Sequence, residues 1–118
     1  MQNPEDLKVW QKSHQLTIEV FKTTESYPWQ RCGVLIRQSQ SSALSIESNI
    51  AEGATRGGDV EFRRFLKISL GSAGELHTQL LVARDLGHLS PGDFTRQDGL
   101  LTEIRKMLWA LICRLGGI

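Results

Sequence analysis

The chain has 118 residues, enough for one hydrophobic core, and we expect residues 1–118 to form a single domain. Its 14 Lys and Arg residues nearly balance its 13 Asp and Glu residues, which argues against a protein that binds nucleic acid through overwhelming positive charge. No apolar run approaches the roughly 20 residues that span a bilayer, and the first 20 residues lack the apolar segment of a signal peptide. We therefore expect a cytoplasmic protein without a membrane partner.

The first segment carries the signature of a helix start. Asn3 can cap a helix and Pro4 suits the first helical position, so we expect a helix to begin here. Apolar residues then recur at spacings of three and four, which predicts that one face of this helix is buried. The predicted face consists of Leu7, Trp10, His14, Ile18 and Phe21. Residues 26–29 and Gly33 interrupt the pattern and predict the first connection.

A second helix is predicted over about 34–52, and a dense polar stretch closes it, Ser-Ile-Glu-Ser-Asn-Ile-Ala-Glu-Gly at residues 45–53. Its inward face is small and hydroxylated, so a neighbouring helix can approach closely. That face consists of Leu35, Ser39, Ser42, Ala43, Ile46 and Ile50. Gly53 suits a left-handed C-terminal position that lets the chain reverse. We expect Asn49 and Glu52 to bond the exposed backbone of the turn that follows.

The third helix is predicted from Asp59, as its cap, to about residue 86. Its apolar and small residues alternate at spacings of four and three without a slip, the pattern of a seam in an antiparallel bundle. The seam consists of Phe62, Leu66, Ser69, Ala73, Leu76, Leu80 and Ala83. Gly71 and Gly74 lie away from this seam, although a glycine inside a helix costs roughly 1 kcal/mol relative to alanine. Their position predicts close contact with something outside the monomer's core.

Ser90 and Pro91 repeat the cap-and-proline start, and the fourth helix that follows has the strongest amphipathic pattern in the chain. Its apolar residues are Leu100, Leu101, Ile104, Met107, Leu108, Leu111, Ile112 and Leu115. Four helices with short connections predict the all-α class and an antiparallel up-down-up-down four-helix bundle.

Several apolar residues fall outside the four predicted core faces. A small bundle cannot bury both sides of its helices, so we interpret these residues, together with the two outward glycines, as the candidate interface of a homo-oligomer. This candidate interface comprises Leu44, Ile68, Gly71, Gly74, Val82 and Trp109. The alternative is a monomer with scattered exposed apolar residues.

No constellation of residues predicts catalysis, a metal site or a cofactor. A di-metal bundle needs inward Glu-x-x-His pairs, whereas Glu75 and His77 are two residues apart and point in different directions on a helix. Cys32 and Cys113 are single and far apart, which favours buried or half-buried thiols over a zinc site. The glycines after residue 53 lack the Gly-Lys-Ser or Gly-Lys-Thr of a phosphate-binding loop. We therefore do not expect an enzyme.

A basic cluster follows the turn into the third helix, and we call it the basic edge. It consists of Arg56, Arg63, Arg64 and Lys67. Three of these residues share one side of the helical projection, and Arg64 lies on its shoulder. Beside a helix N-terminus and a glycine turn, the basic edge is a candidate site for the phosphates of RNA or DNA. The alternative is a solvated face whose arginines pair with Asp59, Glu61 or a neighbouring subunit.

The chain resembles a known family in several stretches. They are residues 6–12, the Ser-Asn-Ile-Ala-Glu-Gly signature at 48–53, residues 62–66, Gly71-Ser72, Glu75-Leu76 and residues 86–89. These stretches are similar to the four-helix bundle proteins of the 23S ribosomal RNA intervening-sequence family, and the similarity extends over nearly the whole chain. The resemblance implies the bundle fold that the periodicity also predicts.

The resemblance further implies a homopentamer, because members are similar to the accessory variability protein of diversity-generating retroelements, a pentameric barrel that binds nucleic acid and a reverse transcriptase. The implied partners are further copies of the chain, RNA or DNA, and a reverse transcriptase or other nucleic-acid enzyme. One departure favours a different class of function. Relatives usually carry basic residues in the middle of the second helix, where this chain has Arg37 and then uncharged residues at 38–42. The alternative is therefore a structural or protein-interaction module without nucleic-acid affinity.

Overall fold

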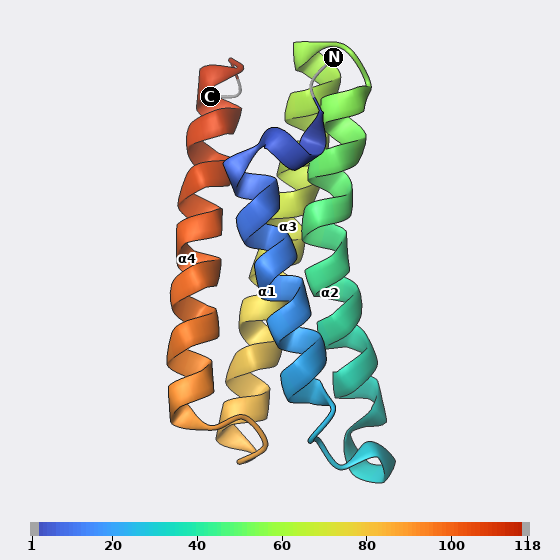
Figure 1. The fold of residues 1–118 in the computed structure, drawn as a ribbon, viewed down its shortest axis with the longest axis vertical. Coiled ribbons are helices and arrows are strands. Elements are labelled where there is room, and N and C mark those ends of the chain that lie inside the picture. Colours follow the sequence, from blue (N-terminus) through green and yellow to red (C-terminus); the bar gives the residue numbers. More distant parts are fainter. Residues whose placement is uncertain (1–2, 117–118) are drawn as a thin grey trace.

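The computed structural model describes residues 3–116, and within them it contains four α helices, one short 3-10 helix and no strand (Figure 1). The 3-10 helix covers Pro4–Asp6, and the α helices are α1 (Lys8–Thr24), α2 (Trp29–Thr55), α3 (Asp59–Asp85) and α4 (Pro91–Arg114). The predicted all-α class and the number of helices are confirmed. Within the described range, no helix is both long and apolar enough to cross a membrane.

The helices form a long, narrow molecule of 43 × 21 × 20 Å. Contacts join α1 to α2 and α4, and they join α3 to the same two helices, so that the four helices stand at the corners of a square. The contact between α2 and α3 is the most extensive. Consecutive helices run in opposite directions, and the chain ends lie at the same end of the molecule as the turn between α2 and α3 (Figure 1).

The core faces of α3 and α4 are the ones that periodicity predicts. All seven seam residues of α3 are buried, and four leucines and isoleucines of α4 are fully buried. The fully buried residues of α4 are Leu101, Ile104, Leu108 and Ile112. Between α2 and α3 the core is hydroxylated, as expected, and Ser69 Oγ donates a hydrogen bond of 2.8 Å to the carbonyl oxygen of Ile46. Small side chains on both helices allow this direct contact between one hydroxyl and the opposite backbone.

The first helix differs from its prediction in its start and in its buried face. Asn3 caps the short 3-10 helix, and α1 begins after it at Lys8. The buried residues of α1 are Val9, Ser13, Leu16, Thr17, Val20 and Thr24, whereas His14 and Ile18 are exposed. The hydroxyls escape the cost of burial because they donate to carbonyl oxygens of the preceding turn, as Ser13 Oγ does to Val9 at 2.6 Å. The spacing of apolar residues in the sequence cannot reveal that these hydroxyl side chains are buried with their hydrogen bonds made.

The predicted end of α2 at Gly53 is wrong. The helix starts earlier than predicted, with a kink at Cys32, and continues to Thr55, so Gly53 lies buried inside it. The residue that takes a positive φ at the turn is Gly57, with φ of 84°, and the cap of α3 is Gly58 rather than Asp59. The chain therefore reverses four residues later than the sequence pattern predicts.

Gly53 is needed for a different reason, which is the close approach of α2 to α3. A Cβ atom at this position would lie 2.8 Å from Phe65 Cβ, 3.0 Å from Phe62 Cδ1 and 3.2 Å from the Phe62 carbonyl oxygen. Real Cβ atoms do not approach other atoms at the shortest of these distances, so any larger residue would push the two helices apart.

Candidate nucleic-acid interface

The exposed part of the basic edge is built around one aromatic ring. Arg56, at the C-terminus of α2, and Arg64, in the second turn of α3, both stack over Phe65, with guanidinium carbons 5.1 and 4.4 Å from the ring centre. Phe65 is 9% exposed, and the side chains of Arg56 and Arg64 remain about half exposed. Such cation–π contacts hold arginine heads at the surface in a defined place. Sequence analysis did not single out Phe65, because it lies beside the seam position Leu66.

Two carboxylates accompany these arginines. Glu52 Oε2 lies 3.2 Å from Arg56 Nε, and Arg64 donates two hydrogen bonds to Glu61 at 3.1 and 3.2 Å. Hydrogen bonding by Arg64 holds the pKa of the Glu61 carboxyl below its usual value. Solvent screens ion pairs at the surface and leaves them weak, so a phosphate can displace either carboxylate at small cost. Together with the exposed Lys67, the surface carries a small positive excess.

Arg63 lies one helical turn before Lys67 on α3, but it is half-buried and its guanidinium group is bonded to the end of α4. Its Nη1 donates a hydrogen bond of 2.7 Å to the carbonyl oxygen of Leu115, just beyond the last residue of α4. The carbonyl groups at a helix C-terminus lack intrahelical partners and carry partial negative charge, so they attract a guanidinium group. Arg63 therefore ties α3 to the end of α4.

The predicted turn residues Asn49 and Glu52 also have different partners. Asn49 Nδ2 donates to the carbonyl oxygen of Ser45 at 2.8 Å and to its hydroxyl at 3.0 Å, one turn earlier in the same helix. Glu52 pairs with Arg56 and does not bond the turn backbone. The expectation that both residues bond that backbone is wrong, because α2 continues past them and satisfies its own amides.

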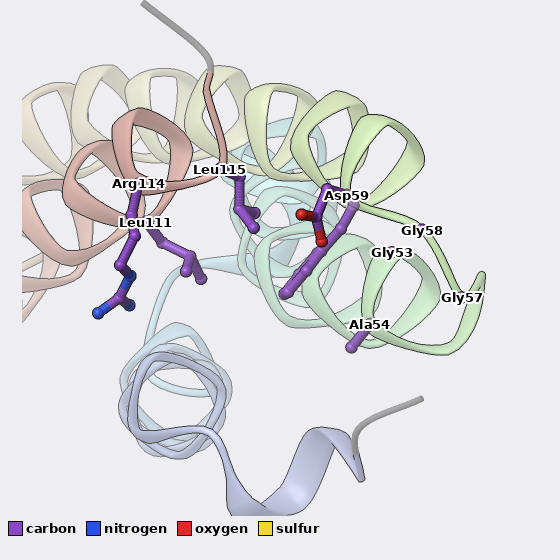
Figure 2. Close-up of a pocket in the computed structure, with 9 residues that line it drawn as sticks. Gly53, Ala54, Gly57, Gly58, Asp59, Leu111, Arg114 and Leu115 are labelled. Atoms are coloured by element: carbon purple, nitrogen blue, oxygen red, sulfur yellow. The ribbon is translucent and has the colours of Figure 1, made fainter.

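A shallow depression of about 630 Å³ lies at the glycine turn, on the side of α3 that faces α4 (Figure 2). Its walls are Gly53, Ala54, Gly57, Gly58, Asp59, Phe62, Leu111, Arg114 and Leu115. The N-terminus of α3 lies at this depression, and the carboxylate of Asp59 belongs to the same first turn. Figure 2 shows Arg114 extending away from the glycines. An anion in this depression would therefore meet negative charge, which disfavours phosphate binding at the turn itself.

The candidate interface residues lie on the outside of the bundle. The exposed fractions of Leu44, Ile68 and Val82 are between 42% and 44%, and that of Trp109 is 53%. A Cβ atom on Gly71 or Gly74 would meet no atom within 4 Å. These positions are available for contact with another molecule.

Two histidines make bonds between helices, which sequence analysis could not assign. His77 Nδ1 lies 2.7 Å from Asp98 Oδ1 of α4, and His14 Nδ1 lies 3.0 Å from Glu47 Oε2 of α2. The ring of His14 also stacks on Trp10 at a centroid distance of 5.0 Å. Across the described residues, no group of three or more His, Cys, Asp or Glu side chains is placed to hold a metal ion.

Comparison with known proteins found one matching family and solved structures of similar fold. Residues 5–110 match the family described as 23S rRNA-intervening sequence protein. A crystal structure of a Bacteroides thetaiotaomicron protein of unknown function, from the S23 ribosomal protein family, is similar in fold, with a TM-score of 0.80. The two chains are 24% identical, and the alignment covers 88% of this chain and 97% of the other. A search of curated proteins found no match.

Proposed function

The chain belongs to the 23S rRNA-intervening sequence protein family, and from this premise we propose that it is a non-enzymatic homopentamer of up-down-up-down bundles that binds RNA or DNA. The observation that carries the proposal is the arrangement of Arg56 and Arg64 over Phe65, with Lys67 exposed on the same helix as Arg64. Fixed guanidinium groups are suited to phosphate because they present several N–H donors in one plane.

Assembly is part of the proposal because one copy offers little charge. At the exposed edge, Glu52 and Glu61 offset two of the three cations, Arg56, Arg64 and Lys67. A single excess charge supports only weak nucleic-acid binding, since affinity grows with the number of phosphates neutralised. Several copies around a ring would join these edges into one basic band. The exposed apolar residues on the outside of the bundle support such an assembly.

Titration against structured RNA and duplex DNA at several salt concentrations tests the proposal. We expect the logarithm of the affinity to fall linearly with the logarithm of salt concentration, with a slope of about −0.7 to −0.9 for each phosphate contacted. Arg64→Glu combined with Lys67→Glu should abolish binding. Arg31→Glu makes the same kind of charge change at the opposite end of α2, away from the basic edge, and this variant should still bind nucleic acid. Absence of binding at low salt would refute nucleic-acid recognition.

A second candidate is a structural or protein-interaction module without nucleic-acid affinity. The ion pairs of Glu52 and Glu61 favour it, because they leave so little net charge at the edge. Under this function the protein would assemble but would not bind RNA or DNA in the salt titration. A nucleic-acid enzyme such as a reverse transcriptase would then be the partner to test for direct binding in the absence of nucleic acid.

A further inference from the structure

A polar groove on the outer side of α2 and α3 is rich in hydrogen-bond acceptors. It encloses about 260 Å³, and its lining includes Gln38, Ser41, Ser45, Ser72, Glu75 and Gln79. The buried Gln79 Oε1 has no hydrogen-bond donor within residues 3–116, and in the same range Glu75 forms no ion pair. Leaving a buried acceptor without a donor costs about 1–3 kcal/mol. The groove therefore fits a cationic side chain with several N–H donors, and arginine has the most.

An unpaired arginine stands on the other exposed side of α3, along α4. Asp98, Thr102, Arg105 and Trp109 follow one another at spacings of four, three and four, so they share one side of α4. The bond between Asp98 and His77 shows that this side borders α3. Trp109 is 53% exposed, and Arg105 is exposed and makes no ion pair with any residue of the described range. This stripe offers one cation and one large apolar side chain.

The groove and the stripe lie at matching heights along the bundle. The bonds from His77 to Asp98 and from Arg63 to Leu115 set the register of α3 against α4. By this register, Trp109 is level with Ile68, and Arg105 is about one helical turn, or about 6 Å, from the level of Glu75. An arginine side chain covers that distance. In a ring whose axis runs parallel to the bundles, all copies stand at the same height. Residues at the same height on neighbouring copies can therefore contact each other.

We infer that Arg105 of one copy enters the polar groove of the next copy and pairs with Glu75, while Trp109 packs on Ile68; this rests on the assembly proposed above. The side formed by α2 and α3 and the side formed by α3 and α4 are adjacent sides of the square. Contact between unlike sides about 90° apart turns each copy relative to the last and closes a ring of about four or five copies instead of a filament. Gly71, which faces outward on α3, leaves room beside the axis of this ring.

Charge reversal tests the contact by light scattering after gel filtration. Glu75→Lys and Arg105→Glu should each weaken assembly at least about tenfold, because each places like charges face to face. The double variant restores opposite charges and should return the dissociation constant to within about threefold of wild type. Trp109→Ala should also weaken assembly. Arg114→Glu, on the side of α4 away from the stripe, is the matched control and should assemble normally. Circular dichroism checks that each variant keeps its helical content.

The outcomes separate this contact from the assembly itself. If wild type is oligomeric but both single reversals keep its mass, the assembly stands and this contact is overturned in favour of another occupant of the groove. If the double variant stays as weak as the single ones, the pairing of Glu75 with Arg105 is overturned. A monomeric wild type at micromolar concentration would overturn both the contact and the proposed assembly.

Discussion

Replacement of Gly53 by alanine measures how closely α2 and α3 approach. In an open helix this change stabilises a protein by up to about 1 kcal/mol, because glycine loses more backbone entropy on folding. Here the new Cβ would lie 2.8 Å from Phe65 Cβ and 3.2 Å from the Phe62 carbonyl oxygen. Neither atom can rotate away, so the two helices must separate. Such overpacking costs about 1–3 kcal/mol, and we expect a net destabilisation of about 1 kcal/mol.

Gly99→Ala is the matched control, since Gly99 lies inside α4 and a Cβ there meets no atom within 4 Å. The same backbone gain without a clash should stabilise the protein by up to about 1 kcal/mol. The two variants should therefore differ by about 2 kcal/mol, or about 8 °C in melting temperature for a domain of this size. Thermal melts followed by circular dichroism, at one protein concentration, measure the difference. A Gly53→Ala protein that melts at or above the Gly99→Ala protein would refute the close-approach argument.

Three further substitutions or titrations test other parts of the structure. Ile50→Asp should destabilise the fold by several kcal/mol, because Ile50 is fully buried and the new carboxylate would have no partner; an unchanged urea midpoint would place this residue outside the core. Burial raises the pKa of Tyr27, the chain's one tyrosine, from 10.0 to about 12. The preference of the folded state for protonated Tyr27 thus contributes fully to the free energy of unfolding below pH 10, and this contribution is lost as pH rises toward 12. An absorbance titration should place the midpoint near 12 for the folded protein and near 10 in urea. Arg63→Ala removes the bond to the Leu115 carbonyl and should speed amide hydrogen exchange in the last turn of α4, whereas Arg64→Ala should leave it unchanged; equal rates in both would contradict the tie between α3 and α4.

The sequence by itself determined the class of the fold and the core of its second half. The seam of α3 repeats at four and three residues without interruption, and every member is buried. Ser90 caps α4 with its side chain and Pro91 occupies the first turn, as the sequence predicts. These features are local, because helical periodicity and capping depend on residues within one or two turns of each other.

For the candidate site, sequence analysis located the exposed cations Arg56, Arg64 and Lys67 but misplaced their surroundings. A helical projection puts Arg63 beside Lys67, and it carries no information that the end of α4 supplies an acceptor there. The role of Phe65 depends on two arginines that stack on its ring, Arg56 at the end of α2 and Arg64 in α3. Each of these contacts joins residues that approach because the helices pack, so spacing along one helix cannot predict them.

Tertiary structure alone decided the role of Gly53. In the sequence, a glycine after a polar helix end predicts a reversal of the chain, whereas in the structure the reversal belongs to Gly57 and Gly53 is buried against Phe62 and Phe65. Both roles require the absence of a side chain, so the residue type cannot distinguish them. The distinction depends on which atoms of α3 lie opposite, and packing between helices sets that distance, while the sequence pattern reports only which face is apolar.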